Sequence, residues 1–155
     1  GRLLEVPVGT GVLTMPLYQT LPKADVTCLD YSPDMMAQAR EKADRMGLKN
    51  VRFRQGDVGA LPFPDGSLDL VTAFETVYFW KNLPVCFREV KRVLKPGGQF
   101  AVINDPGDPE KHWENLVAGM VVYSPEDIAA QMEAAGFSNV RVTTRKHTYC
   151  VVGAV

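Results

Sequence analysis

The chain has 155 residues, of which 46% are hydrophobic and 23% are charged, a composition typical of one ordinary globular domain rather than a fibrous or disordered protein. Its 17 basic and 18 acidic side chains give a formal net charge of −1, so charge does not argue for a nucleic-acid partner or an anionic membrane surface. No apolar run approaches the roughly 20 residues that a membrane-spanning helix needs.

Three cysteines, Cys28, Cys86 and Cys150, are widely spaced and contain no CxxC pair. The cysteines and histidines do not form the two pairs of closely spaced ligands that a structural zinc site has. We therefore expect reduced thiols, no metal site and a cytoplasmic protein. Because the chain starts at Gly1 directly before a strand-like run, we also expect that a preceding segment is missing.

The first predicted strand, RLLEV at 2–6, leads into a glycine-rich stretch, EVPVGTG at 5–11. Gly9 and Gly11 remove side chains where a ligand could approach the backbone, and the amino terminus of a following helix would add amide donors. A lone G-x-G is weak evidence, because the dinucleotide pattern requires a third glycine and Pro7 stands at the place of the first. The stretch by itself is compatible with a nucleotide site or with a simple tight turn.

The helix after these glycines either begins at Thr14 or is kinked at Pro16. The second strand is predicted at 25–30 and the second helix at 33–46. Ser32 is a good N-cap for this helix, a proline follows in its first turn, and a glycine supplies the left-handed stop.

The middle of the chain continues the alternation of strands and helices. Strands are predicted at 50–57 and 68–74, and a helix follows at 83–94. The sequence KPGG at 95–98 is expected to stop this helix, and the fifth strand is predicted at 99–105.

The last part of the chain changes its pattern after a second helix start signal. Ser124 opens an S-x-x-D box, a proline follows it, and Gly136 ends the predicted helix. The strand-like runs at 138–146 and 147–155 leave no room for a helix between them, so they should be antiparallel neighbours.

Together these elements predict a single α/β domain over 1–155. The sheet should be seven-stranded, mostly parallel and Rossmann-like, doubly wound, with an antiparallel C-terminal strand. Its active surface should lie at the carboxyl ends of the strands, where the strand order reverses.

Acidic residues recur at the ends of successive predicted strands, namely Glu5, Asp30 and Asp57. Carboxylates at strand ends face a common crevice, where they can accept hydrogen bonds from sugar hydroxyls or a base amine. Each aspartate alone could equally be a turn residue, because aspartate favours strand ends. Together with the glycine turn, the three acids favour a ligand site.

Four segments in this order resemble class I S-adenosylmethionine-dependent methyltransferases of the small-molecule type. They are LLEVPVGTG, CLDYSPDMMAQAR, FRQGDVGALPFPDGSLDLV and FREVKRVLKPGGQFAVIND. The resemblance covers nearly the whole chain, and it implies S-adenosylmethionine as cofactor, S-adenosylhomocysteine as product and a small-molecule acceptor. It also implies that the usual N-terminal helices, which cover the cofactor, are absent here.

The resemblance assigns one group of residues to the methionine half of the cofactor. Glu5 resembles the family's first-strand acid, which helps hold the glycine loop and the methionine amino group. The loop that passes this half corresponds to Gly9, Thr10 and Gly11, and Phe74 matches the residue that borders the transferable methyl. Pro7 departs from the family's glycine, so the resemblance leaves cofactor affinity and loop geometry open at this position.

A second group corresponds to the adenosine half. Asp30 matches the acid that binds both ribose hydroxyls, and Tyr31 and Met35 match positions that flank the adenosine. Asp57 and Val58 match the pair that reads adenine, with the carboxylate accepting from the exocyclic amine and the next backbone amide serving the ring.

Glu75 and Tyr78 follow the fourth strand, on the side where the acceptor would lie. The neighbouring Phe79 and Trp80 are better explained as packing under the next helix. His112 is a candidate base for the acceptor, although a solvated surface histidine is the favoured interpretation.

Two alternatives remain open at this stage. One is a catalytically inactive or partner-dependent S-adenosylmethionine-binding domain. The other, less favoured, is an NAD-dependent oxidoreductase, which Asp30 fits but the missing third glycine and the antiparallel tail do not.

Overall fold

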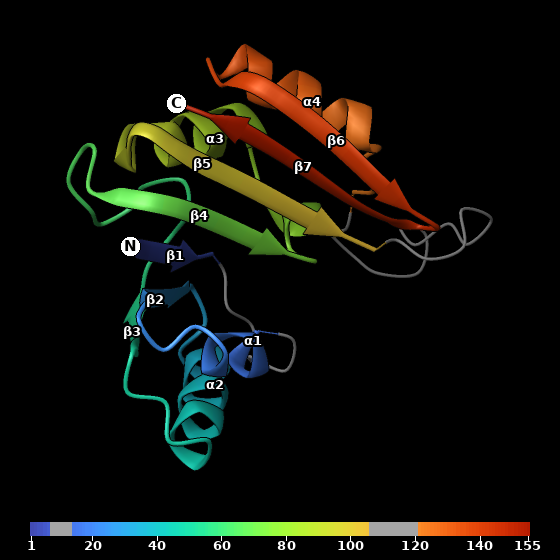
Figure 1. The fold of residues 1–155 in the computed structure, drawn as a ribbon. Helices are drawn as coiled ribbons and strands as arrows, with labels where there is room; N and C mark the ends of the chain where they lie inside the picture. The colour runs from blue at the N-terminus through green and yellow to red at the C-terminus, as the bar shows by residue number, and fades with distance from the viewer. Residues whose placement is uncertain (7–13, 106–120) are drawn as a thin grey trace.

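The computed structural model describes residues 1–6, 14–105 and 121–155, and the chain forms one seven-stranded sheet in the order β3-β2-β1-β4-β5-β7-β6 (Figure 1). The strands are β1 (Arg2–Glu5), β2 (Asp25–Asp30), β3 (Val51–Gln55), β4 (Leu68–Phe74), β5 (Leu94–Asn104), β6 (Ser138–Arg145) and β7 (Thr148–Ala154). The helices are α1 (Met15–Gln19), α2 (Pro33–Arg45), α3 (Leu83–Val93) and α4 (Pro125–Ala134), with a short 3-10 turn, η1 (Val77–Phe79), before α3.

The strand directions confirm the predicted fold class. From β3 to β5 neighbouring strands pair in parallel, whereas β7 is antiparallel to both β5 and β6. The strand order reverses at β1, because the chain builds β2 and β3 on one side of it and β4 and β5 on the other. In doubly wound sheets, ligands bind beyond the carboxyl ends of the strands at this point.

The sheet is covered on both faces around its centre. Leu3 of β1 and Cys28 of β2 belong to a smaller core with α1 and α2, whereas the adjacent Leu4 and Leu29 belong to a larger core with α3 and α4. Successive residues of a strand point to opposite faces, so these apolar pairs require a cover on each side. Figure 1 shows α1 and α2 together near β2, away from α3 and α4.

Most predicted boundaries agree with the structure to within one or two residues. The 33–46 helix ends at Arg45, and Ser32 caps it by accepting a hydrogen bond from the Met35 amide. The first helix begins at Met15 with Thr14 as its N-cap and a proline in its first turn, which decides between the two alternatives for that helix.

The prediction that KPGG at 95–98 separates a helix from a strand is wrong in detail. Strand β5 already begins at Leu94, which pairs with Leu68, and the glycines lie within it. Gly97 has a φ of +83°, and the register shifts between Leu68 and Leu70. The glycines therefore form an irregular part of the strand, because only glycine adopts this φ without strain.

Candidate functional site

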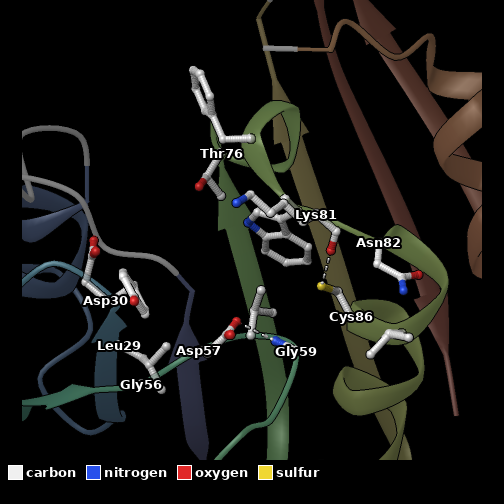
Figure 2. Close-up of a pocket in the computed structure, with 14 residues that line it drawn as sticks. Leu29, Asp30, Gly56, Asp57, Gly59, Thr76, Lys81, Asn82 and Cys86 are labelled. Carbon is white, nitrogen blue, oxygen red and sulfur yellow. Dashed lines mark hydrogen bonds between the residues drawn. The ribbon is translucent and has the colours of Figure 1, made fainter. Parts of the chain in front are cut away.

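A cavity of about 540 Å³ opens at the carboxyl ends of β2 and β3 (Figure 2). Three stretches of the chain line it: Leu29, Asp30 and Tyr31; Gly56, Asp57, Val58 and Gly59; and Thr76, Phe79, Trp80, Lys81, Asn82, Val85 and Cys86. The first two stretches leave the ends of neighbouring parallel strands, and the third connects β4 to α3. The cavity therefore lies where the fold rule places a ligand site.

Asp30 ends β2 and connects two parts of the cavity wall. Its backbone carbonyl accepts a hydrogen bond from the Gly56 amide at 3.0 Å, and its Oδ1 accepts one from the Ser32 amide at 2.9 Å. The first bond ties the end of β2 to the segment after β3, and the second ties the carboxylate to the start of α2. Tyr31 follows at the rim with a largely exposed side chain.

Asp57 lies in a tight turn just beyond β3, and not within the strand as predicted. Its Oδ1 accepts from the Gly59 amide at 2.9 Å, and its carbonyl accepts from the Ala60 amide at 3.1 Å. Val58 is half-buried against the larger core. The turn thus fixes one carboxylate oxygen of Asp57 and places the residue among those that line the cavity, as Asp30 does (Figure 2).

Gly56 is a site residue that the sequence analysis missed. A Cβ at this position would lie 2.8 Å from Leu29 Cδ1 and 3.4 Å from Pro62 Cγ. The backbone therefore passes close to a buried leucine at the floor of the cavity, and a larger side chain would displace it. The signal available in the sequence was the glycine directly before the strand-end aspartate.

The segment between β4 and α3 forms the other wall of the cavity. Trp80 is buried, and its ring meets the Phe87 ring of α3 edge to face with centroids 6.1 Å apart, which confirms that it packs under the helix. Phe79 does not: its side chain is 48% exposed and lines the cavity, so the packing interpretation is wrong for this residue. The 3-10 turn explains the difference, because it buries Val77 and Tyr78 and leaves Phe79 on the outside.

Three further lining residues surround the start of α3 and were also missed. Asn82 is the N-cap of α3 and has a φ of +56°, a left-handed conformation that asparagine tolerates better than most residues. The Cys86 thiol donates to the Lys81 carbonyl at 3.2 Å. Burial, with the nearby Asp57 charge, raises the pKa of Cys86 to about 11, so the thiol is neutral and unreactive at physiological pH.

Glu5 lies outside this cavity and joins β1 to α1. Its carboxylate accepts hydrogen bonds from the Thr14 hydroxyl, at 2.9 Å, and from the Tyr18 hydroxyl. The side chain is almost fully buried, and this burial raises its pKa to about 7, although the two hydrogen bonds act in the opposite direction. The acid therefore holds together the two elements that flank residues 7–13.

Glu75 and Tyr78 lie beyond the end of β4 and do not line the cavity. Glu75 has a φ of +55°, and its carboxylate accepts a hydrogen bond from the Asp105 amide. Burial raises the pKa of the Glu75 carboxyl group. Burial also raises the pKa of the Tyr78 hydroxyl, and the negative charge of the neighbouring Glu75 raises it further. A strained backbone that carries a desolvated carboxylate is a feature often found at functional sites.

The structure brings together some of the predicted site residues and not others. Asp30, Tyr31, Asp57 and Val58 share the cavity. Met35 is partly exposed on α2, and Phe74 ends β4 half-buried; neither lines the cavity. Five predicted positions lie outside the described residues: Pro7, Gly9, Thr10, Gly11 and His112.

A family model described as a methyltransferase domain matches residues 4–102, a span that includes both cavity aspartates. The chain belongs to the S-adenosylmethionine-dependent methyltransferase family. This confirms the resemblance stated from the four sequence segments, and it leaves the nicotinamide-dependent alternative without support.

Curated methyltransferases align with much of the chain. A demethylmenaquinone methyltransferase from Thermus thermophilus is 40% identical over 109 residues, which cover 70% of this chain and 49% of the relative. A phosphatidylethanolamine N-methyltransferase from Cereibacter sphaeroides is 42% identical over 105 residues, covering 67% of this chain and 50% of the relative. The chain therefore spans about half the length of the curated relatives it matches.

Solved methyltransferases share the fold over almost the whole chain. A SAM-dependent methyltransferase from Aquifex aeolicus superposes with a TM-score of 0.79 at 25% identity, covering 98% of this chain and 80% of that one. The apo form of the S-adenosylmethionine-dependent methyltransferase SibL gives a TM-score of 0.81 at 24% identity, covering 99% of this chain and 50% of that one.

Over residues 1–6, 14–105 and 121–155 the structure contains no cluster of side chains suited to hold a metal ion. None of the helices within these ranges is long and apolar enough to cross a membrane.

Proposed function

We propose that this chain binds S-adenosylmethionine with its adenosine half in the cavity and transfers the methyl group to a small-molecule acceptor. The observation that carries the proposal is the pair of carboxylates, Asp30 and Asp57, at the ends of neighbouring parallel strands on one cavity. The cavity volume of about 540 Å³ is in the range that small-molecule sites occupy.

The residues present fit an adenosine group. Asp30 would accept hydrogen bonds from the ribose hydroxyls. Asp57 would accept one from the exocyclic amine of adenine, because its Oδ1 is engaged by the Gly59 amide and its Oδ2 makes no hydrogen bond within the part of the chain that the structure describes. The exposed ring of Phe79 offers an apolar surface to a flat base.

The methionine half is proposed to lie toward β1 and the segment after it. Glu5 is buried between β1 and α1, and a carboxylate there would attract the methionine amino group. Other cofactor-binding roles stay predictions from the family resemblance, namely those of Gly9, Thr10, Gly11, Met35 and Phe74. The effect of Pro7 on cofactor affinity is a prediction of the same kind.

The cofactor supplies an activated methyl group, so the protein has chiefly to align the acceptor and exclude water. Glu75 lies at the carboxyl end of β4, next to the elements that carry the cavity. Its raised pKa makes the carboxylate a better proton acceptor than an exposed glutamate. We therefore propose that Glu75 takes up the acceptor's proton, with Tyr78 as its neighbour; His112 stays a candidate for the same task.

The acceptor class is proposed from the relatives. Their names describe a demethylated menaquinone and phosphatidylethanolamine as acceptors, both small molecules with long apolar parts. A lipid-like small molecule is therefore the first class to test. A cytoplasmic location, expected from the unpaired cysteines, stays a prediction.

Calorimetric titration with S-adenosylhomocysteine tests the cofactor site. We expect saturable binding by the wild type, and at least tenfold weaker binding by Asp30→Ala, because a hydrogen bond to a charged group contributes about 1.5–3 kcal/mol. Asp34→Ala, on an exposed position of the first turn of α2, is the matched control and should bind as the wild type does.

No binding by the folded wild type at millimolar ligand, or equal binding by Asp30→Ala, would contradict the proposed site. A transfer assay with labelled S-adenosylmethionine and a panel of quinols and phospholipids then separates an active enzyme from a domain that only binds the cofactor.

A further inference from the structure

The segment from Asp57 to β4 has no regular secondary structure, yet it is firmly attached to the rest of the domain. Leu61 is buried in the larger core, and the Phe63 ring lies under the Arg54 guanidinium with 5.5 Å between them. The Ser67 hydroxyl donates to the Pro64 carbonyl at 2.8 Å. This segment begins with the turn that carries the adenine-side carboxylate of the cavity.

Two side chains of α3 hold this segment by its backbone. Glu89 Oε2 accepts a hydrogen bond from the Leu61 amide at 2.8 Å, and Arg92 Nη2 donates to the Leu61 carbonyl at 2.9 Å. Arg92 Nη1 donates to the Phe63 carbonyl at 2.9 Å and to Asp65 Oδ1 at 2.7 Å. Both backbone polar groups of Leu61 are therefore bound by α3.

Glu89 and Arg92, which we call the α3 clasp, also fix each other. Arg92 Nε donates to Glu89 Oε1 at 2.9 Å, and Arg92 Nη2 donates to Glu89 Oε2 at 3.0 Å. This two-point contact uses the planar fork of arginine, which lysine lacks. The neighbouring guanidinium lowers the pKa of Glu89 and keeps its carboxylate charged.

The clasp acts on Asp57 through a short covalent connection. The turn at Asp57 closes with the Ala60 amide on the Asp57 carbonyl at 3.1 Å, and Leu61 is the next residue. Since Leu61 is fixed at both its amide and its carbonyl, the turn cannot shift along the cavity wall without breaking these bonds. The same turn aims the Asp57 carboxylate by the bond from the Gly59 amide.

We propose that Glu89 and Arg92 are positioning residues for base recognition, which hold the Asp57 turn where its carboxylate can read the exocyclic amine of adenine. The proposal rests on the proposed cofactor function. It predicts a defect in discrimination between bases, and not only a loss of stability, when the clasp is broken.

The test compares two ligands that differ only at the base. S-adenosylhomocysteine carries the exocyclic amine, whereas S-inosylhomocysteine carries a carbonyl oxygen in its place. We expect the wild type to bind the adenine compound about tenfold more tightly, and Arg92→Met to reduce this ratio to about twofold. A variant that was merely less stable would lower both affinities alike and keep the ratio.

Arg88→Met is the matched control, because Arg88 lies exposed on the same helix and, within the part of the chain that the structure describes, makes no hydrogen bond to the segment. Its ratio should stay at the wild-type value. Arg92→Lys, which keeps the charge and loses the fork, should show an intermediate ratio. If Arg92→Met does not fold, the ratio for Arg92→Lys decides the question.

An unchanged ratio in a folded clasp variant would overturn the positioning role, even though the wild type binds S-adenosylhomocysteine. Absence of binding by the wild type would instead overturn the proposed cofactor site. A wild type that binds both ligands equally would show that Asp57 does not read the amine and would overturn the inference as well.

Discussion

Glu5 shows how one buried acid can link fold and ligand chemistry. It lies between β1 and α1, accepts two hydroxyl donors, and has its pKa raised from 4.5 to about 7 by burial. A carboxylate that is costly to ionise in the free protein is stabilised when a positive group approaches it. The methionine amino group of the cofactor is such a group in the proposed complex.

The raised pKa of Glu5 should make the free energy of unfolding depend on pH. Between pH 4.5 and about 7 the folded state binds the proton that the unfolded state has released, so the free energy of unfolding should fall as pH rises through this window and then level off. The total change is of order 3 kcal/mol. Urea denaturation at pH 5 and pH 8 measures it.

Glu5→Gln should flatten this dependence, because the amide oxygen still accepts from Thr14 or Tyr18 but does not titrate. Glu41→Gln, at an exposed position of α2, is the control and should keep the wild-type profile. An equal pH dependence in wild type and Glu5→Gln would show that the buried acid is not its source.

Gly56 is a second residue at which the close packing of the backbone shapes the cavity. Gly56→Ala should destabilise the protein by about 1–3 kcal/mol, because the new methyl group would lie 2.8 Å from the buried Leu29. Gly59→Ala, whose added Cβ would lie no closer than 3.5 Å to any described residue beyond its chain neighbours, should change the free energy of unfolding by less than about 0.5 kcal/mol. Chemical denaturation of both variants checks this difference, and equal costs would contradict it.

At the scale of elements, α2 and α4 both begin at a proline that follows a serine N-cap, and they differ in the hydrogen bonds that this serine makes. Ser124 of α4 forms a complete capping box, with its hydroxyl accepting from the Asp127 amide at 3.0 Å and its own amide donating to Asp127 Oδ2 at 3.1 Å. Ser32 of α2 accepts from the Met35 amide at 3.3 Å, and among the described residues it forms no capping box.

Ser124→Ala should therefore cost about 1 kcal/mol of unfolding free energy, and Ser32→Ala clearly less. Thermal or urea unfolding of the two variants, made in the same background, measures the difference. A larger loss from Ser32→Ala would show that the cap distances do not rank the two helices.

The elements were largely predictable because their signals are local. A serine cap followed by proline indicated the starts of α2 and α4, and short apolar runs between the helical segments indicated β2 and β4 at their observed bounds. Residues 95–98 were misread, because their pairing depends on distant partners, as Leu94 does on Leu68.

The site was predictable only in part, for the same reason. Asp30 ends β2 and Asp57 follows two residues after β3, positions that the sequence predicts to within two residues, and they do share one cavity. Phe79 and Asn82 line that cavity because of a 3-10 turn and a left-handed N-cap, which depend on three-dimensional packing. The contacts of Glu89 and Arg92 with the segment before β4 could not be predicted, because in the sequence the two residues look like part of an ordinary charged helix face.

At the scale of the whole molecule, the fold places a cavity of about 540 Å³ at the carboxyl ends of β2 and β3. The sheet separates two hydrophobic cores. The segments that follow β2, β3 and β4 supply the three stretches that line the cavity. The chain spans about half the length of the curated relatives, and its described residues contain the proposed adenosine site more fully than an acceptor site.

A crystal structure of the chain with S-adenosylhomocysteine tests the central claim most directly. We expect the ribose hydroxyls to donate to the Asp30 carboxylate and the adenine ring to lie between the Asp57 turn and Phe79, with the exocyclic amine on Asp57. Ligand bound at another surface, or adenine directed away from Asp57 while the ligand is fully ordered, would show that the proposed adenosine site is wrong.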